Sequence, residues 1–289
     1  MKRTVFAAAI AAVLSVAVSP AIAQDLGPTL TKIRQNNTFT IGHREASVPF
    51  SALNQQQRAE GFSIDLCLKV AEAAKEQLNL PNMQVRFVPV TPQTRFALIA
   101  NGTIDMECGS TTNTIARQGQ AAFTATTFIT GTKIMVRANS GIRSVDDLAG
   151  KTLVVLPGTT NEQALKAYIE QKRMQVRILN VRDHAEALLA METDRADAYG
   201  SDDVLLYGSR RRSRNPAQYV VVGDFITFDP YALAVPRNDS TFLTLANRTL
   251  ARMFRDGSFK ATYDKWFGPL DMPLNPLLEA AIQLQAIPE

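Results

Sequence analysis

The sequence predicts an α/β fold with two lobes joined by a hinge. Strand-like and helix-like segments alternate along the chain, a pattern typical of a mainly parallel sheet covered by helices. The alternation restarts after residue 141, which indicates a second α/β unit over about residues 137–228. The last segment, residues 232–289, supplies one strand and two amphipathic helices, which is too little for a separate domain. We therefore expect the chain to leave the first lobe, build the second and return, so that two crossing segments form the hinge.

The first 23 residues predict an export signal. Lys2 and Arg3 precede an apolar run over residues 5–18, and the small-residue sequence "AIA" ends at Ala23. The apolar run is shorter than the about 20 residues that span a bilayer. We expect cleavage after Ala23 and a soluble protein in the periplasm, with an uncleaved membrane anchor as the alternative.

The remaining chain has the length of two domains of about 100–150 residues. We assign residues 24–133 and 232–289 to the first lobe and residues 134–231 to the second. The first long helix, expected over residues 62–78, has one apolar face that repeats every four positions through Leu66, Val70, Ala74 and Leu78.

Charge and cysteine content exclude several classes of protein. Removing Lys2 and Arg3 with the signal lowers the formal charge from +4 to +2, which does not indicate a nucleic-acid partner. We interpret the dense basic run over residues 210–214 as a solvated helix end. Cys67, in an expected helix, and Cys108, at an expected strand end, could pair in an oxidising compartment, but we favour free buried thiols.

Polar residues gather where expected strands run into expected helices. Ligands of open α/β sheets bind at the carboxyl ends of the strands, so these junctions are the candidate site. Five junctions carry such residues: Arg44; Arg95; Ser110 to Thr114 with Arg117; Thr160; and Asp183 with His184.

Several of these junctions have the pattern of a helix N-terminus. We expect Thr91 to cap a helix whose first residue is Pro92. Thr160 with Gln163, and Asp183 with Glu186, have capping-box spacing. Helix N-termini attract carboxylate or phosphate, and arginine holds a carboxylate with two hydrogen bonds. Although each cap alone has an ordinary structural interpretation, the set predicts an anion receptor.

The sequence contains no pattern that indicates a cofactor. Histidine, cysteine and carboxylate residues do not have metal-ligand spacing, and only His43 and His184 are available to activate a nucleophile. No glycine-rich phosphate loop follows an expected strand. We therefore expect neither a metal nor a cofactor.

Longer segments carry a family resemblance. They are "GHREASVPFS", "GFSIDLCLKVAEA", "NGTIDMECGSTTNTIARQ", "PGTTNEQ", "RDHAEALLAMETDRADAYGSDD" and "YDKWFG". Together they resemble the periplasmic solute-binding proteins of amino-acid ABC transporters, family 3, and in particular the glutamate/aspartate branch. The resemblance implies a type II periplasmic-binding-protein fold that clamps one amino acid and delivers it to a membrane permease, without catalysis. We expect a monomer.

The resemblance also implies a role for each site residue. The backbone groups of the amino acid would be held by Ser110, Thr112, Arg117 and Thr160, which contact the α-carboxylate, and by Asp202, which pairs with the α-ammonium.

The distal carboxylate of the amino acid would contact Arg44, Arg95 and His184, and Tyr231 would line the cleft. The branch often has serine where this chain has Pro92, which has no hydroxyl. Either a neighbouring threonine, Thr91 or Thr94, replaces it, or the acidic side chain is held differently.

A second departure from the family lies at Ser63, where an acidic residue is usual and Asp65 follows two positions later. We expect it to affect packing at a helix entry and not ligand chemistry.

The charges favour an acidic ligand. Three arginines face one carboxylate, Asp202, and a neutral ligand would leave buried guanidinium groups unpaired, which costs several kcal/mol. The glutamate-versus-aspartate choice stays open, and a binder of glutamine or asparagine is an alternative.

Two further alternatives concern the class of protein. An enzyme on the same scaffold, similar to cyclohexadienyl dehydratase, would need an acid or base from Glu107, Asp202, Asp229 or His184. A sensor domain of a larger receptor is the other. We expect a free-standing binding protein.

Overall fold

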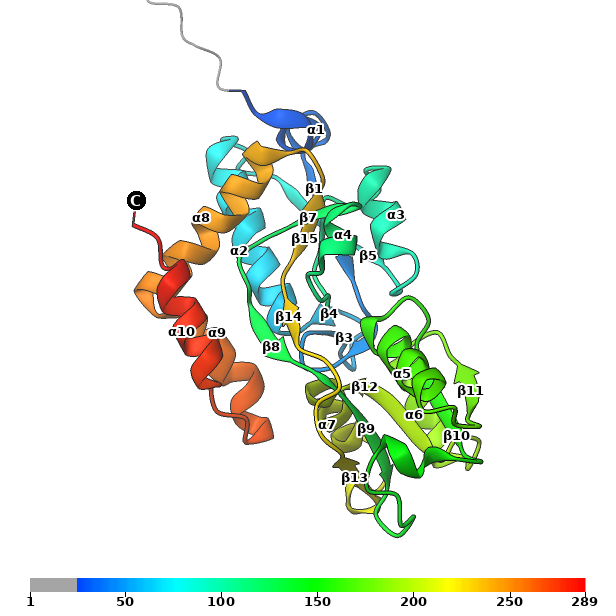
Figure 1. The fold of residues 1–289 in the computed structure, drawn as a ribbon. Helices are drawn as coiled ribbons and strands as arrows, with labels where there is room; N and C mark the ends of the chain where they lie inside the picture. The colour runs from blue at the N-terminus through cyan, green and yellow to red at the C-terminus, as the bar shows by residue number, and fades with distance from the viewer. Residues whose placement is uncertain (1–24, 289) are drawn as a thin grey trace, which may run out of the picture.

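Two five-stranded sheets, each covered by helices, form the core of the computed structural model, which describes residues 25–288 (Figure 1). The expected α/β, two-lobed fold is confirmed. The expected signal peptide and its cleavage after Ala23 lie outside the described residues. Within residues 25–288, no helix combines the length and apolar character needed to cross a membrane.

The first sheet belongs to the first lobe. Its strands, in spatial order, are β5 (Gln84–Pro89), β1 (Thr38–His43), β6 (Met106–Glu107), β15 (Ala234–Pro236) and β7 (Ala121–Phe123). Strand β1 is parallel to β5 and β6, whereas β15 is antiparallel to β6 and β7. Because β15 follows the whole second sheet in sequence, the chain returns to the first lobe as expected.

The second sheet has a related order: β11 (Arg177–Asn180), β10 (Thr152–Val155), β12 (Ala198–Asp202), β9 (Thr132–Arg137) and β13 (Tyr219–Val222). Its strands send alternate residues to two buried clusters. Met135 and Val154 join one cluster, while Ile134 and Leu153 join the other. Both faces are apolar because helices cover both sides, as in other parallel-sheet lobes.

Two crossing segments connect the lobes. Strand β8 (Phe128–Thr130) leads through Gly131 into β9, and β14 (Asp229–Tyr231) leads back toward β15. The two strands pair antiparallel and lie side by side between the sheets (Figure 1). At Gly131 an added Cβ would lie 2.2 Å from the carbonyl oxygen of Thr227, so the two segments approach too closely for a side chain there.

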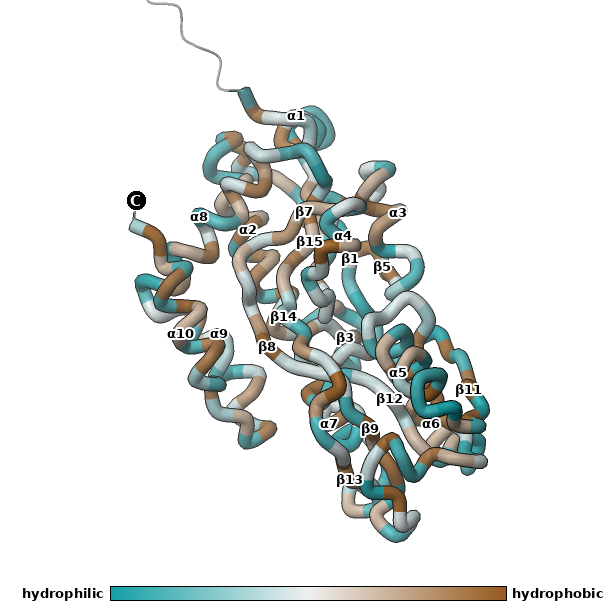
Figure 2. Tube along the Cα trace, viewed as in Figure 1, coloured by the Kyte–Doolittle hydropathy of each residue, from teal (hydrophilic) through white to brown (hydrophobic). Residues whose placement is uncertain are grey.

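Helices cover the sheets and connect their strands. They are α1 (Gly27–Asn36), α2 (Phe62–Gln77), α3 (Arg95–Ala100), α4 (Ile115–Gln118), α5 (Thr160–Gln171), α6 (His184–Glu192), α7 (Asp203–Arg212), α8 (Ser240–Asp256), α9 (Ser258–Phe267) and α10 (Pro276–Gln285). Hydrophobic and hydrophilic residues alternate along them, as expected for helices with one buried face (Figure 2). The predicted apolar face of α2 is buried at all four positions. A small sheet of β2 (Ala46–Ser47), β3 (Ser51–Leu53) and β4 (Ala59–Glu60) precedes α2.

A disulfide joins Cys67 on α2 to Cys108, which directly follows β6. The expected positions in a helix and at a strand end are confirmed, but the expectation of free thiols is wrong. Helix α2 packs across the first sheet and brings the two Cα atoms to 6.3 Å, within the usual range for a disulfide. A separation of 41 residues in the chain does not reveal that approach.

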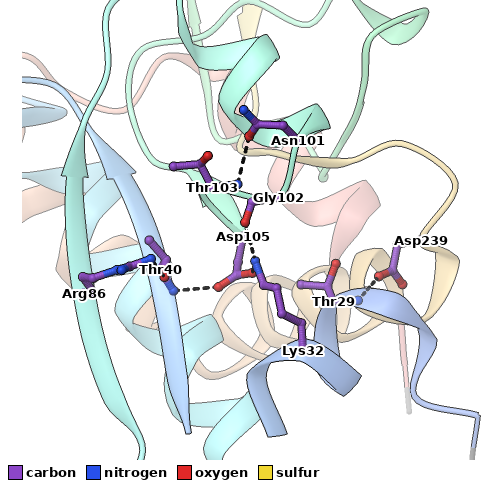
Figure 3. Close-up of polar contacts among 9 residues, drawn as sticks. All are labelled: Thr29, Lys32, Thr40, Arg86, Asn101, Gly102, Thr103, Asp105 and Asp239. Carbon is purple, nitrogen blue, oxygen red and sulfur yellow. Dashed lines mark hydrogen bonds and ion pairs between the residues drawn. The ribbon is translucent and has the colours of Figure 1, made fainter. Parts of the chain in front are cut away.

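A buried carboxylate fastens the N-terminal helix to the first lobe (Figure 3). Asp105 accepts a hydrogen bond of 2.7 Å from the backbone N–H of Thr40 and pairs with Lys32 of α1. Lys32 also donates to the carbonyl of Gly102 at 2.7 Å. Burial raises the pKa of Asp105, which Lys32 and Thr40 oppose. These contacts hold α1 and the segment before β6 against β1.

Candidate ligand-binding site

A cavity lies between the lobes, at the carboxyl ends of the parallel strands. Its lining residues are Arg44, Pro92, Arg95, Ser110, Thr112, Arg117, Thr159, Thr160, Asn161, His184, Asp202 and Leu205. The structure thus brings together eight of the nine residues named from the sequence. Tyr231 is not part of the lining and contacts Asp202 instead.

Two arginines of the first lobe converge on one carbonyl group of the second. Arg117 Nη2 donates to the carbonyl oxygen of Gly158 at 3.1 Å, and Arg95 Nη2 lies 3.5 Å from the same atom. The ring of Phe96 lies below both guanidinium groups, 5.0 Å from that of Arg95 and 5.8 Å from that of Arg117. These contacts fix both cations at the cavity wall. Burial, followed by the nearby Arg95, lowers the pKa of Arg117 to about 10, so it stays charged at neutral pH.

A hydrogen-bonded relay orients Arg95 from behind. Arg95 Nη1 donates to the hydroxyl of Thr111 at 2.6 Å, and that hydroxyl donates to Glu107 Oε2 at 2.7 Å. Glu107 is fully buried but does not line the cavity. The sequence-based charge count omitted this carboxylate, and it omitted the buried Asp229. The preference for an acidic ligand therefore rests on the charges that line the cavity, where three arginines face Asp202 alone.

Of the three arginines that line the cavity, Arg44 has the fewest protein partners. The residue is 3% exposed. Its hydrogen bonds within residues 25–288 involve its backbone atoms only, so its guanidinium group donates none to this part of the chain. Burial, followed by the nearby Arg95, lowers its pKa to about 10, so it remains a cation at neutral pH. A buried cation without such partners is costly unless an anion joins it.

His184 is the first residue of α6, and Asp183 caps this helix by accepting from the N–H of Glu186 at 2.9 Å, as predicted. Burial, with the charge of Arg44 as the second cause, lowers the pKa of His184 to about 3. Its Nδ1 contacts the hydroxyl of Tyr199, whose pKa is raised by burial. The Tyr199 hydroxyl therefore stays protonated and can donate a hydrogen bond to Nδ1. Neutral His184 then carries its own proton on Nε2, which can act as a donor.

Asp202 lies at the end of β12 and is 3% exposed. Asn161 Nδ2 donates to its Oδ1 at 3.0 Å, and the hydroxyl of Tyr231 donates to its Oδ2. Burial, followed by the charge of Asp229, raises the pKa of Asp202 to about 7. A cation placed beside this carboxylate would favour its ionised form.

Hydroxyl groups from both lobes complete the wall. The hydroxyls of Thr112 and Thr160 lie 3.2 Å apart, and Thr112 also donates to Asp229 at 3.0 Å. Ser110 lines the cavity beside them. The lining therefore combines cations, one carboxylate and hydroxyl groups, which is the set of groups a zwitterion with an extra negative charge requires.

Residues 39–269 match the profile of bacterial extracellular solute-binding proteins, family 3. The chain belongs to this family. The L-glutamate/L-aspartate-binding protein of Pseudomonas aeruginosa is 40% identical over 97% of this chain and 94% of its own length. The glutamate/aspartate import solute-binding protein of Escherichia coli K12 is 38% identical over 89% of this chain and 87% of its own. The expected type II periplasmic-binding-protein fold is confirmed.

A solved structure extends the comparison. The ancestral amino acid-binding protein AncCDT-1, a precursor of cyclohexadienyl dehydratase, is 29% identical with a TM-score of 0.71, and the match covers 83% of this chain and 100% of that one. The curated relatives above are solute-binding proteins, which confirms the expectation of a binding protein rather than an enzyme.

Two helix starts in this family 3 protein differ from expectation, that of α3 by three residues and that of α5 by one. Helix α3 begins at Arg95 and not at Pro92, because residues 92–94 form a turn. The N-cap of α5 is Thr159, which accepts from the N–H of Glu162 at 3.0 Å, while Thr160 is the first helical residue. Adjacent threonines make both caps plausible from the sequence. The shift leaves the Thr160 hydroxyl available to the cavity.

Pro92 and Ser63, the two departures from the family pattern, have different consequences. Pro92 lines the cavity, whereas Thr91 and Thr94 do not and bond each other at 3.2 Å. Neither threonine therefore replaces a serine hydroxyl. Ser63 donates at 2.7 Å to the carbonyl of Gly109, directly before Ser110. It does not line the cavity, and this bond supports the segment that carries site residues.

The sequence analysis missed Asn161 and Gly158 in this solute-binding protein. Asn161 is 4% exposed and links Asp202 to Thr132, to whose hydroxyl it donates at 2.7 Å. Its position directly after Thr160 at a helix start was the available signal. Gly158 acts through its carbonyl oxygen, which no residue type reveals.

Proposed function

We propose that this protein binds L-glutamate or L-aspartate in the cavity and delivers it to the membrane permease of an ABC transporter. The observation that carries the proposal is the buried guanidinium group of Arg44, which lacks a hydrogen-bonded partner in the described chain while Asp202 lies in the same cavity. An acidic amino acid supplies both the missing anion and a cation for Asp202. The names of the relatives from Pseudomonas aeruginosa and Escherichia coli support the same ligands.

Each end of the amino acid has its partners. The α-carboxylate contacts Arg117 and the hydroxyls of Ser110, Thr112 and Thr160, and the α-ammonium pairs with Asp202. The distal carboxylate contacts Arg44, Arg95 and the Nε2 of His184. Tyr231 acts indirectly, since its hydroxyl bonds Asp202 and restrains that carboxylate.

The two lobes close on the ligand about the β8–β14 pair. We further propose that the boundaries between the lobes lie at residues 133 and 231. The signal peptide is cleaved after Ala23, and the mature protein is a monomer in the periplasm. The contacts between Arg117 and Gly158 and between Thr112 and Thr160 support closure, because they join the lobes beside the cavity.

The experiment that tests this proposal is calorimetric titration of the mature protein with the twenty amino acids. We expect L-glutamate and L-aspartate to bind at least tenfold more tightly than glutamine and asparagine, because the amides leave Arg44 without an anion. Absence of binding heat with both acidic amino acids would contradict the proposal. Tighter binding of an amide would instead favour the glutamine or asparagine alternative.

The affinity should depend on pH through Asp202. The α-ammonium binds the ionised carboxylate, whose pKa without such a partner is raised to about 7 by burial. Below pH 7 binding must release a proton, so the dissociation constant should rise by about tenfold per pH unit between pH 7 and 5. His184, with a pKa of about 3, stays neutral over this range.

Titrations in buffers of different ionisation enthalpy measure the released proton directly. The affinity should be flat above about pH 8, and proton release should vanish in the Asp202→Asn variant. A dissociation constant that stays constant from pH 8 to 5 would contradict the assignment of the ammonium group to Asp202.

A further inference from the structure

Helix α7 of the second lobe approaches the backbone of the first lobe at Gly208. A Cβ added to Gly208 would lie 2.3 Å from the carbonyl oxygen of Val48 and 3.1 Å from its carbonyl carbon. The first distance is far below van der Waals contact, and the second is tighter than usual for a Cβ atom. The three nearest atoms to that Cβ all belong to Val48.

Nothing in the local backbone requires glycine at this position. Gly208 lies inside a ten-residue helix, and its φ is not in the left-handed region. Glycine in a helix interior is less stable than alanine. The close approach of Val48 is therefore the physical reason why a side chain does not fit.

The Val48 carbonyl belongs to a turn that cannot yield easily. The backbone N–H of Phe62 on α2 donates to Pro49 at 2.9 Å, and that of Ser63 donates to Phe50 at 3.0 Å. Within the turn, the N–H of Phe50 donates to Ser47 at 2.8 Å. These bonds fasten residues 47–50 to the first lobe.

The contact lies between the lobes and beside the hinge, because Phe50 of the same turn packs against both hinge strands. Helix α7 packs on β9, β12 and β13 of the second sheet. Its first residue, Asp203, accepts from Thr130 of the hinge strand β8, and Gly208 follows more than one turn later. Leu205, three residues before Gly208 and on the same helix face, lines the cavity, whereas Gly208 does not. Rotation of the lobes about the hinge would change the distance between Gly208 and Val48.

We propose that Gly208 determines ligand affinity from outside the cavity, because its missing side chain lets the second lobe close fully against the Val48 turn. This inference rests on the proposed function, in which the lobes close around an amino acid. Substitution by alanine stops closure before the cavity walls reach the ligand. The steric clash raises the free energy of the closed form alone, since the obstructing atoms of Val48 belong to the other lobe.

The test compares Gly208→Ala with the parent by titration with L-glutamate and L-aspartate. Overpacking of this kind predicts a weakening of about five- to 150-fold. Both ligands should lose the same factor, because no cavity group changes. The melting temperature of the free protein should be equal or higher, since alanine favours the helix.

Gly268→Ala is the matched control. Gly268 also has a right-handed helical backbone, with φ of −54°, and no atom lies within 4 Å of its added Cβ. Its affinity should match that of the parent. Small-angle X-ray scattering at saturating ligand should show a smaller radius of gyration for the parent and this control than for Gly208→Ala.

The outcomes separate this inference from the proposed function. Parent-like affinity and contraction in Gly208→Ala overturn the inference while the function stands. If another amino acid binds and contracts the parent instead, the function fails, and the loss in Gly208→Ala is measured with that ligand. If no amino acid contracts the parent, both fail. Unequal losses for glutamate and aspartate would place the effect inside the cavity and overturn the inference.

Discussion

Replacing Asp202 by asparagine should weaken the binding of glutamate and aspartate by about a hundredfold or more. The α-ammonium would then be buried against a neutral amide, and removing one member of a buried ion pair costs about 3–5 kcal/mol. Asparagine keeps the size of the side chain and an oxygen that can accept from Asn161. The loss should therefore come from charge and appear equally for both ligands in calorimetric titration.

The folded protein should tolerate this change. Because burial raises the pKa of Asp202, its ionised form is disfavoured in the folded state, and removal of the charge should not lower the melting temperature at neutral pH. Asp224→Asn removes the same charge at an exposed position and is the control. Affinity within threefold of the parent in Asp202→Asn would refute the ammonium assignment.

Replacing Arg44 by methionine should change the preference between acids and amides. Arg44 is the cavity arginine whose guanidinium has no hydrogen bond to the described chain, so its favourable partner is the ligand. We expect glutamate to lose about 30- to 100-fold, the range for a buried charge-assisted pair. Glutamine, with a neutral distal group, should change by less than about threefold.

Methionine retains much of the unbranched chain and removes the buried charge, so the free protein should become more stable. Arg58→Met, at an exposed position, controls for the change in net charge. Equal losses for glutamate and glutamine in Arg44→Met would refute contact with the distal carboxylate. Arg95 is a less suitable target, because its replacement also breaks the bond to Thr111 and leaves Glu107 unbalanced.

Much of the site was predictable because its residues occupy one topological position. Arg44, Arg95, Ser110 and His184 each follow a strand of a parallel sheet, and parallel strands bring their carboxyl ends to the same edge. The rhythm of strands and helices therefore sufficed to group them. The cap at Asp183 was predictable for a similar reason, since capping depends on residues three positions apart.

Contacts between distant segments were not predictable in this way. The Cys67–Cys108 disulfide depends on how α2 crosses the sheet, and the charge of Glu107 reaches Arg95 only through Thr111. In the chain, Glu107 is one acidic residue among many. Its burial places its charge close to Arg95, and that burial is a property of the packed lobe.

The sequence by itself thus determined the α/β class, the return of the chain to its first lobe and most of the polar side chains that face the cavity, because periodicity, caps and strand ends are local. The tertiary structure decided how the lobes meet. The Gly158 carbonyl between Arg95 and Arg117, and the Val48 carbonyl against Gly208, involve backbone atoms that every residue possesses. Only the relative placement of the two lobes selects which backbone atoms come into contact.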